Sequence, residues 1–200
     1  MALIHHSPFT DDSLSPGPGL IGRAQDFFND EGIPMPQAHP TYDQLADLPR
    51  YGSYTVPPEW VDANGHMNIR HYFDVGSQAA MERAAGLGLD AEYMTNRNLG
   101  VFTVEQHMRY LAEMRLGANL STRVRIGGIG SRALLLASYV LDDDNRRLSM
   151  IFETMLVHIS FSTRRTTDFP DDLREDLDAA VAAEDALGWD PALSGALRIR

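Results

Sequence analysis

Hydrophobic and polar positions repeat with two different periods along this chain of 200 residues. Over residues 68–86 the apolar and small residues recur at helical spacing, which predicts a helix with Asn68 as its N-cap. The side expected to be buried carries Ile69, Tyr72, Phe73, Gly76, Ala79, Ala80 and Ala84. Because many of these residues are small, the helix backbone can approach its packing surface closely.

After residue 100 the period changes to two, which is typical of strands. Four strands are expected, at 101–111, 119–129, 133–141 and 148–161. The last is apolar on both faces, so it should be central and covered on each side. The glycines at 127, 128 and 130 indicate a bulge or a sharp bend.

Three further segments flank this core. A short strand at 54–61 contains Pro57 and Pro58, which confine it to an edge or a bulge. A helix is expected at 171–187. The first 49 residues hold seven of the 11 prolines and should be mostly extended, with one short helix at 20–28. They form either an arm packed on the domain or on a partner subunit, or a disordered leader.

One strand, a loop, one long helix and four antiparallel strands predict an α+β fold in which the sheet curls around the helix. We expect an acidic arm at 1–50, the main domain at 51–167, and an acidic helix and tail at 168–200. The formal net charge is −11, of which the arm carries −5 and the tail carries −6. The middle is neutral, which disfavours nucleic-acid binding. A strongly curved sheet leaves an edge exposed, so a homodimer or homotetramer is expected.

Composition narrows the chemistry further. The absence of Cys and Lys excludes disulfides, thiolate nucleophiles and Schiff-base lysines. No metal is expected, since His66, His71, His107 and His158 have no zinc-binding spacing. No apolar run reaches the length of a membrane span, and the N-terminus does not resemble a secretion signal. We therefore expect a cytoplasmic protein with no membrane contact.

The densest polar cluster reads VDANGHMN and stands directly before the predicted long helix. Asp62 supplies a carboxylate, Asn64 and His66 are polar groups nearby, and Gly65 lets the backbone approach a ligand. Free N–H groups at a helix start stabilise negative charge. This set suits acyl transfer, in which the carboxylate attacks the carbonyl or activates water and the amides hold the developing charge. The alternative is structural, with Asp62 and Asn68 as caps and turn formers and His66 as a loop histidine.

The same stretch resembles the Asp-x-x-Gly-His-x-Asn signature of hotdog-fold acyl-CoA thioesterases of the 4-hydroxybenzoyl-CoA type, whose fold has the same order of elements. The strings VPPEWVDANGHM and TVEQHMRYLAE resemble most closely the betainyl-CoA thioesterases of carnitine breakdown. The resemblance implies that Asp62 is the catalytic carboxylate. It also implies that backbone N–H groups around Gly65 and at Asn68 and Ile69 are the oxyanion donors. Ile69 departs from the aromatic residue often found at that position, which bears on the choice of acyl group.

The Asp-x-Asn-x-His spacing also resembles plant acyl-carrier-protein thioesterases, in which these side chains serve catalysis together with a later Glu. The resemblance implies that Asn64 and His66 position water or substrate. Glu113 matches the later Glu only through a loose register.

Substrate contacts are expected from residues further along the chain. Glu105 and His107 share a strand face with Arg109, so they either line the acyl pocket or form a salt-bridge network at a dimer face. The phosphates of CoA would meet arginines of the later strands, unless these only solvate strand faces: Arg123, Arg125 and Arg132.

Aromatic residues offer a second possibility for substrate binding, because aromatic rings attract quaternary ammonium groups. The candidates for such a cage are Trp60, Tyr72, Tyr110 and Phe102. The alternative is that they belong to the core.

The sequence therefore predicts hydrolysis of a small acyl-CoA or acyl-carrier thioester, with no cofactor beyond the CoA of the substrate. One rival is a hotdog enoyl-CoA hydratase, but its signature places the His one residue further from the Asn. The other rival is a non-catalytic acyl-ligand binder on the same scaffold.

Overall fold

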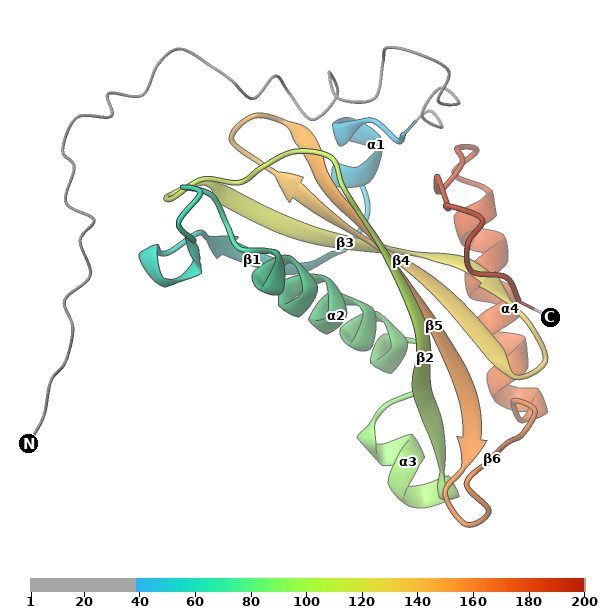
Figure 1. Ribbon diagram of the computed structural model, residues 1–200. Coiled ribbons are helices and arrows are strands. Elements are labelled where there is room, and N and C mark those ends of the chain that lie inside the picture. Colours follow the sequence, from blue (N-terminus) through green and yellow to red (C-terminus); the bar gives the residue numbers. More distant parts are fainter. Residues whose placement is uncertain (1–38, 200) are drawn as a thin grey trace, which may run out of the picture. The chain divides into compact units, whose positions relative to one another are not determined.

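The computed structural model describes residues 39–199, so the helix expected at 20–28 lies outside the described residues. The elements are α1 (Tyr42–Ala46), β1 (Arg50–Thr55), the 3-10 turn η2 (Pro58–Trp60), α2 (Ile69–Gly86), α3 (Ala91–Arg97), β2 (Leu99–Tyr110), β3 (Asn119–Ile129), β4 (Ala133–Asp142), β5 (Arg147–Ser160), β6 (Arg165–Thr166) and α4 (Asp171–Asp185). All paired strands are antiparallel, in the order β1-β3-β4-β5-β2, with β6 on β5. The sheet curves around α2, which confirms the predicted α+β architecture (Figure 1).

The long helix α2 begins where its cap predicts, because the Asn68 side chain accepts a hydrogen bond from the N–H of Arg70 at 3.0 Å. Its small residues permit close packing: a Cβ added at Gly76 would lie 2.8 Å from the ring of Phe152. The buried stripe differs from the prediction at two positions, since Ile69 and Phe73 are 64% and 37% exposed. Along the first turns of α2 the sheet covers the neighbouring side of the helix, where Tyr72, Val75 and Gly76 are buried.

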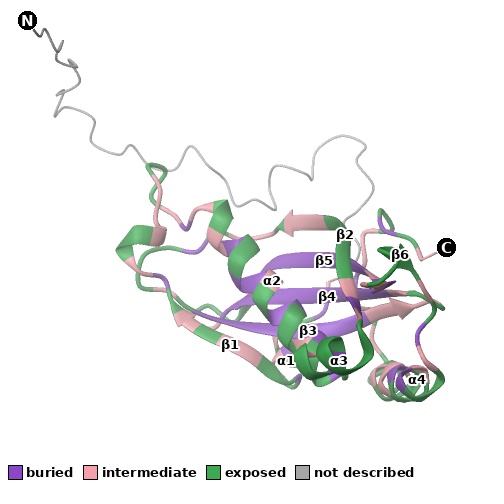
Figure 2. Ribbon diagram, turned by 90° about the horizontal axis from the view of Figure 1, so that it is seen from below, coloured by how far each residue is buried: buried purple, intermediate pink, exposed green. Residues whose placement is uncertain are grey.

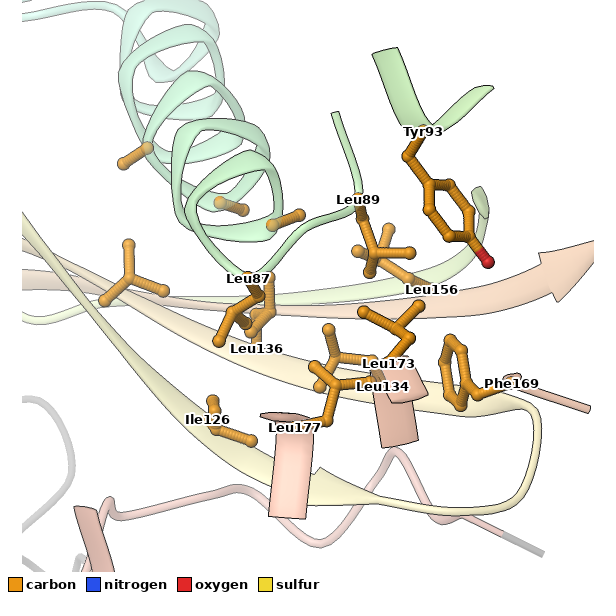
Figure 3. Close-up of a cluster of buried hydrophobic side chains, with 14 residues drawn as sticks. Leu87, Leu89, Tyr93, Ile126, Leu134, Leu136, Leu156, Phe169, Leu173 and Leu177 are labelled. Atoms are coloured by element: carbon orange, nitrogen blue, oxygen red, sulfur yellow. The ribbon is translucent and has the colours of Figure 1, made fainter. Parts of the chain in front are cut away.

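Strand β5 is central and buried on both faces, as predicted (Figure 2). On the α2 side, the C-terminal half of that helix packs with leucines of β4 and α4 (Figure 3). On the other side, here called the outer face, Tyr139 and Ile151 pack against Leu45 of α1 and Ala192 near the C-terminus. Alternate residues of β5 therefore serve two different cores.

The C-terminal part of the chain protects one sheet edge and the outer face. Strand β1 pairs only with the first half of β3, and α4 packs beside the second half. There Glu184 of α4 accepts a hydrogen bond from the N–H of Ile126 at 2.6 Å. The segment after α4 then crosses the outer face, where Pro191 accepts a hydrogen bond from Tyr139. The boundaries drawn at residues 51 and 168 stay predictions, although residues on both sides of them pack on one sheet.

Two strands lie at the sheet edges. β1 is an edge strand, as the prolines indicated, but it ends at Thr55 rather than running over 54–61, because Pro57 and Pro58 direct the chain into the 3-10 turn η2. β2 forms the other edge, and a bulge lies between Thr103 and Glu105. The glycine-rich end of β3 also shifts register, between Ile126 and Gly128, which confirms the predicted bulge. Helix α3 was not predicted, since its seven residues carry no clear apolar period.

Candidate active site

The loop before α2 is closed by backbone pairing. Val61 and Met67 form an isolated antiparallel bridge, and within it the N–H of Asp62 donates to the carbonyl of His66 at 3.1 Å. Gly65 has a φ of +79°, a conformation that glycine adopts without strain. The sequence Asp-Ala-Asn-Gly-His thus folds back on itself and delivers Asn68 to the helix start.

The Asp62 carboxylate, which is partly buried, lies at the N-terminal end of α2. Its Oδ1 accepts from the N–H of Asn64 at 2.8 Å, and its Oδ2 accepts from Nδ2 of Asn68 at 3.3 Å. A helix N-terminus carries partial positive charge, which attracts negatively charged groups placed beside it. Asp62 therefore closes its own turn with one oxygen, while the other is tied to the residue that caps the helix.

Backbone amides at this end differ in their availability. Two of the three expected donors are engaged, because Gly65 donates to the carbonyl of Asp62 at 3.0 Å and Asn68 to that of Trp60 at 2.8 Å. The N–H of Arg70 is bound by the helix cap. Among residues 39–199, the N–H of Ile69 has no hydrogen-bond partner. Loop closure therefore uses the N–H groups of Gly65 and Asn68, while that of Ile69 stays available, and which amides hold the oxyanion stays a prediction.

The two other polar side chains of the motif share this loop. Asn64 is exposed and His66 is partly buried. Neither side chain makes a hydrogen bond to another described residue, so both are free to meet water or substrate. Their catalytic roles stay predictions.

The floor of the loop is a segment that sequence analysis did not connect with the site. Met67 donates from its N–H to the carbonyl of Met114 at 2.7 Å. Met114 in turn donates from its N–H to the hydroxyl of Tyr72 at 2.9 Å, and that hydroxyl donates to the carbonyl of Ala112 at 3.2 Å. Burial raises the pKa of Tyr72, which keeps this phenol neutral. Tyr72 is only 3% exposed, so its place in a substrate cage was wrong.

The remaining aromatic candidates do not gather into a cage within one chain. Trp60 stacks on His71 with ring centroids 4.8 Å apart, so that partner covers one face of the indole. Tyr110 meets Tyr72 edge-on. Phe102 lies in the half of β2 that does not contain Tyr110, and it contacts Phe161. Trp60 and Tyr110 thus lie at the same end of the molecule as the buried Tyr72, whereas Phe102 lies further along β2.

Glu105 and His107 share a face with Arg109 as predicted, but it is the outer face, away from α2 and Asp62. The partner on that face is Glu153 of β5, which is fully buried. Its carboxylate lies 3.7 Å from His107 Nδ1 and 3.6 Å from an Arg109 nitrogen. Within one chain His107 and Arg109 approach Glu153 rather than lining a site with Asp62, and Glu105 takes no part in this network among residues 39–199. Glu153 was missed, although a lone Glu in an apolar strand was the available signal.

Two of the predicted phosphate-binding arginines are buried inside the protein. Arg123 and Arg125 are each only 2% exposed. The guanidinium of Arg125 donates to the carbonyl of Trp189 at 2.7 Å and lies 4.2 Å from the centroid of that indole. Arg132 is exposed and pairs with Asp168, beside the β3–β4 turn at the opposite end of α2 from Asp62. The structure contradicts the phosphate-binding role for Arg123 and Arg125, because both side chains are buried, that of Arg125 against the segment after α4.

Glu113 lies beside Met114, on the segment below the Asp62 loop. Its carboxylate pairs with Arg115 at 2.6 Å. The structure thus brings Glu113 to the correct end of the molecule without a contact to Asp62. No group of His, Cys, Asp or Glu side chains that could hold a metal ion occurs within residues 39–199.

Comparison with known proteins identifies the family. The family model described as "Thioesterase-like superfamily" matches residues 56–177, which include the whole Asp62 loop and α2. The chain belongs to the thioesterase-like superfamily. The fold is accordingly the hotdog fold, with α2 as the helix that the sheet wraps.

Individual relatives of this thioesterase-like chain refine the comparison. An "L-carnitine dehydrogenase/betainyl-CoA thioesterase" of Agrobacterium fabrum is 35% identical over 78% of the chain, which spans only 32% of that relative. A "Betainyl-CoA thioesterase" of Pseudomonas aeruginosa is 29% identical over 68% of the chain and is itself covered to 86%. A hypothetical protein of Staphylococcus aureus, solved in complex with CoA, has a TM-score of 0.66 at 24% identity and covers 76% of this chain and 97% of its own. No helix within the described residues is long and apolar enough to span a membrane.

Proposed function

We propose that this protein hydrolyses a small acyl-CoA thioester to the free acid and CoA, with betainyl-CoA as the first substrate to test. Two relatives whose names include betainyl-CoA thioesterase support this proposal, and one of them is covered over most of its length. The region that the family model matches includes the complete loop that carries Asp62. Presenting one acyl group both on CoA and on an acyl-carrier protein decides which carrier this protein accepts.

The observation that carries the proposal is the juxtaposition of Asp62 and the free Ile69 N–H at one helix start. Asn68 joins the two, because its amide binds the Asp62 carboxylate and its backbone precedes Ile69. A thioester carbonyl placed between them would have a carboxylate on one side and an amide donor for its oxygen on the other. The side chain of Ile69 is exposed, so it leaves this end of the helix accessible.

In the proposed reaction Asp62 either attacks the carbonyl carbon or removes a proton from the water that attacks it. The carbonyl oxygen becomes an oxyanion, which the Ile69 N–H stabilises together with the helix N-terminus. The C–S bond then breaks, and CoA leaves as the thiol with a proton that comes from the water. Where Asp62 itself attacks, water hydrolyses the mixed anhydride that forms, which releases the acid and restores the Asp62 carboxylate. Asn64 and His66 order the water or the substrate. Because Arg123 and Arg125 are buried, the exposed Arg115 at this end is the proposed contact for the CoA phosphates.

The test is a comparison of Asp62→Asn with Asp74→Asn in a panel of betainyl-, aromatic and medium-chain acyl-CoA thioesters. Asp74 is a matched control, since it is an acid on the first turns of α2 that pairs with Arg70 and His71 on the surface. Asp62→Asn should lower kcat by about 10² to 10⁴, the range that a positioned base contributes. Asp74→Asn should stay near wild type. If Asp62→Asn hydrolyses its substrate at the wild-type rate, the proposed role of Asp62 is wrong.

We also propose that the protein forms a homodimer or homotetramer by pairing along β2. Within the described chain this edge strand pairs only with β5, so its other edge is free. It exposes three apolar side chains, Phe102, Val104 and Tyr110. Unpaired strand edges with exposed apolar residues readily pair with another chain. The outer face of the sheet is less suited to association, because α1 and the C-terminal segment already cover it. A cytoplasmic location remains a prediction, to be checked by cell fractionation.

A further inference from the structure

We propose that Tyr72 is a positioning residue, which fixes the Asp62 loop relative to the start of α2 through a relay of hydrogen bonds. The proposal rests on the proposed function, since Asp62 and the Ile69 amide are the groups held in register. Tyr72 would not contact the substrate, because its side chain is buried beneath the segment that supports the loop.

The relay begins at the Tyr72 hydroxyl, which uses both its donor and its acceptor on one short stretch of backbone. It donates to the carbonyl of Ala112 at 3.2 Å and accepts from the N–H of Met114 at 2.9 Å. This stretch follows the last residue of β2 and has no strand pairing of its own beyond two bonds to Ser149, made by Leu111 and Ala112. The phenol thus replaces the ladder bonds that a continuing strand would have supplied.

From there the relay continues to the loop. The carbonyl of Met114 accepts from the N–H of Met67 at 2.7 Å. Met67 is also the residue that bridges with Val61 and so closes the turn around Asp62. Both methionines are almost completely buried, at 0% and 1% exposure, so water cannot readily replace this bond. The backbone carbonyl of Met114 therefore fixes the position of the Asp62 loop.

The relay returns to the element from which it started. Tyr72 lies three residues after Ile69, on the same helix whose first N–H is the proposed oxyanion donor. Met67 leads through Asn68 directly into that helix. Helix, supporting segment and loop therefore form a closed ring of contacts, and a catalytic carboxylate must be held to within a fraction of an ångström of its partner donor. Without the Tyr72 hydroxyl the ring is open at the Met114 amide.

Tyr139 is a matched control for a purely structural tyrosine. It is also fully buried, and its hydroxyl donates to the carbonyl of Pro191 at 2.8 Å. Burial raises its pKa as it does that of Tyr72. However, Tyr139 lies in the core on the outer face and binds the segment after α4. It takes no part in the hydrogen-bond relay to the Asp62 loop. Loss of either hydroxyl removes buried hydrogen bonds, but only those of Tyr72 lead to the Asp62 loop.

The experiment compares Tyr72→Phe with Tyr139→Phe in full-length protein. We measure kcat and KM for the best thioester, Tm, and amide hydrogen exchange over residues 61–68 and 112–114. Tyr72→Phe removes both hydrogen bonds of the hydroxyl, and it should lower kcat about tenfold and leave KM within about twofold. It should also speed exchange at Met67 and Met114. Tyr139→Phe should lower Tm to a similar extent while kcat and exchange at Met67 stay at wild-type values.

Unchanged kcat in Tyr72→Phe, or an equal loss of kcat in both variants, would overturn the proposal. Tyr72→4-aminophenylalanine keeps a hydrogen-bonding group at the ring and should restore most of the lost activity, so the proposal stays testable if Tyr72→Phe does not fold. If wild type hydrolyses no acyl-CoA, the proposed function fails on its own. Exchange at Met67 and Met114 then still tests the relay, because that measurement needs no turnover.

Discussion

Asn68 binds Asp62 and the first turn of α2 with opposite ends of one side-chain amide. Its Nδ2 donates to Asp62 Oδ2 at 3.3 Å, while its Oδ1 accepts from the N–H of Arg70 at 3.0 Å. A single residue thereby caps the helix and orients the carboxylate beside it. These two roles can be separated by substitution, because they use different atoms.

Asn68→Ser should keep the helix but slow catalysis. A serine hydroxyl caps helices about as well as an asparagine side chain, so Tm should change little. The donor to Asp62 is lost, and a hydrogen bond to a charged group is worth roughly 1.5 kcal/mol, which corresponds to about a tenfold lower kcat. Asn68→Ala loses the cap as well, so its free energy of unfolding should be about 1 kcal/mol lower. Equal kcat values for Asn68→Ser and wild type would mean that this contact does not orient Asp62.

Gly76→Ala should destabilise the protein although alanine favours helices. The helix-propensity gain is about 1 kcal/mol, whereas overpacking a close contact costs about 1–3 kcal/mol. The new Cβ would lie 2.8 Å from the Phe152 ring and 3.0 Å from the end of Met150. Gly86→Ala is the control on the same helix, since a Cβ there meets nothing within 4 Å. Chemical denaturation should show a loss for Gly76→Ala and a gain or no change for Gly86→Ala; the reverse order would exclude close packing as the cause.

Association through β2 should be sensitive to charge at Val104. This residue lies at the bulge of the free edge strand and is 51% exposed. Val104→Arg should convert a species of at least twice the 22.2 kDa chain mass into a monomer, as measured by light scattering. Leu187→Arg, at a 43% exposed leucine after α4, should leave the mass unchanged. A wild-type protein that is already monomeric at micromolar concentration would contradict the proposed pairing.

Stability should fall as the pH drops through the range in which His158 titrates. This histidine is fully buried, with Nε2 2.8 Å from the Tyr93 hydroxyl and Nδ1 3.0 Å from the carbonyl of Thr167. Desolvation lowers the pKa of His158 below its ordinary 6.5, and also that of His39. The unfolded chain then binds more protons than the folded one between the two pKa values. The stabilisation is therefore present above about pH 6.5 and is lost as the pH falls below it.

Unfolding free energies at several pH values between 7.5 and 5 test this. His158→Gln should be less stable at pH 7.5 but should lose less on acidification, and adding His39→Gln should flatten the curve further. Carboxylates such as Asp172, whose pKa is lowered by the hydrogen bond from Arg97, act only below their ordinary 3.8 and lie outside this window. An identical slope in wild type and the double variant would show that these histidines do not control the pH dependence.

Local patterns in the sequence determined much of this protein. The cap at Asn68, the four long strands to within two residues at their ends, the edge position near the prolines and the bulge near Gly128 all follow from interactions between close neighbours in the chain. The Asp62 motif and its place before α2 were visible for the same reason. Each of these features depends on backbone preferences or side chains only a few residues apart.

The tertiary structure alone decided which chemical groups stay available. Whether the N–H of Asn68 is free depends on Trp60, and whether Arg125 can meet a phosphate depends on Trp189, 64 residues later. The face on which Glu105 lies is fixed by a bulge one residue before it. The pattern showed which residues could do chemistry, but long-range packing uses some of their atoms to close loops and cover the sheet. Contacts between distant segments have no local period, so only the folded chain reveals them.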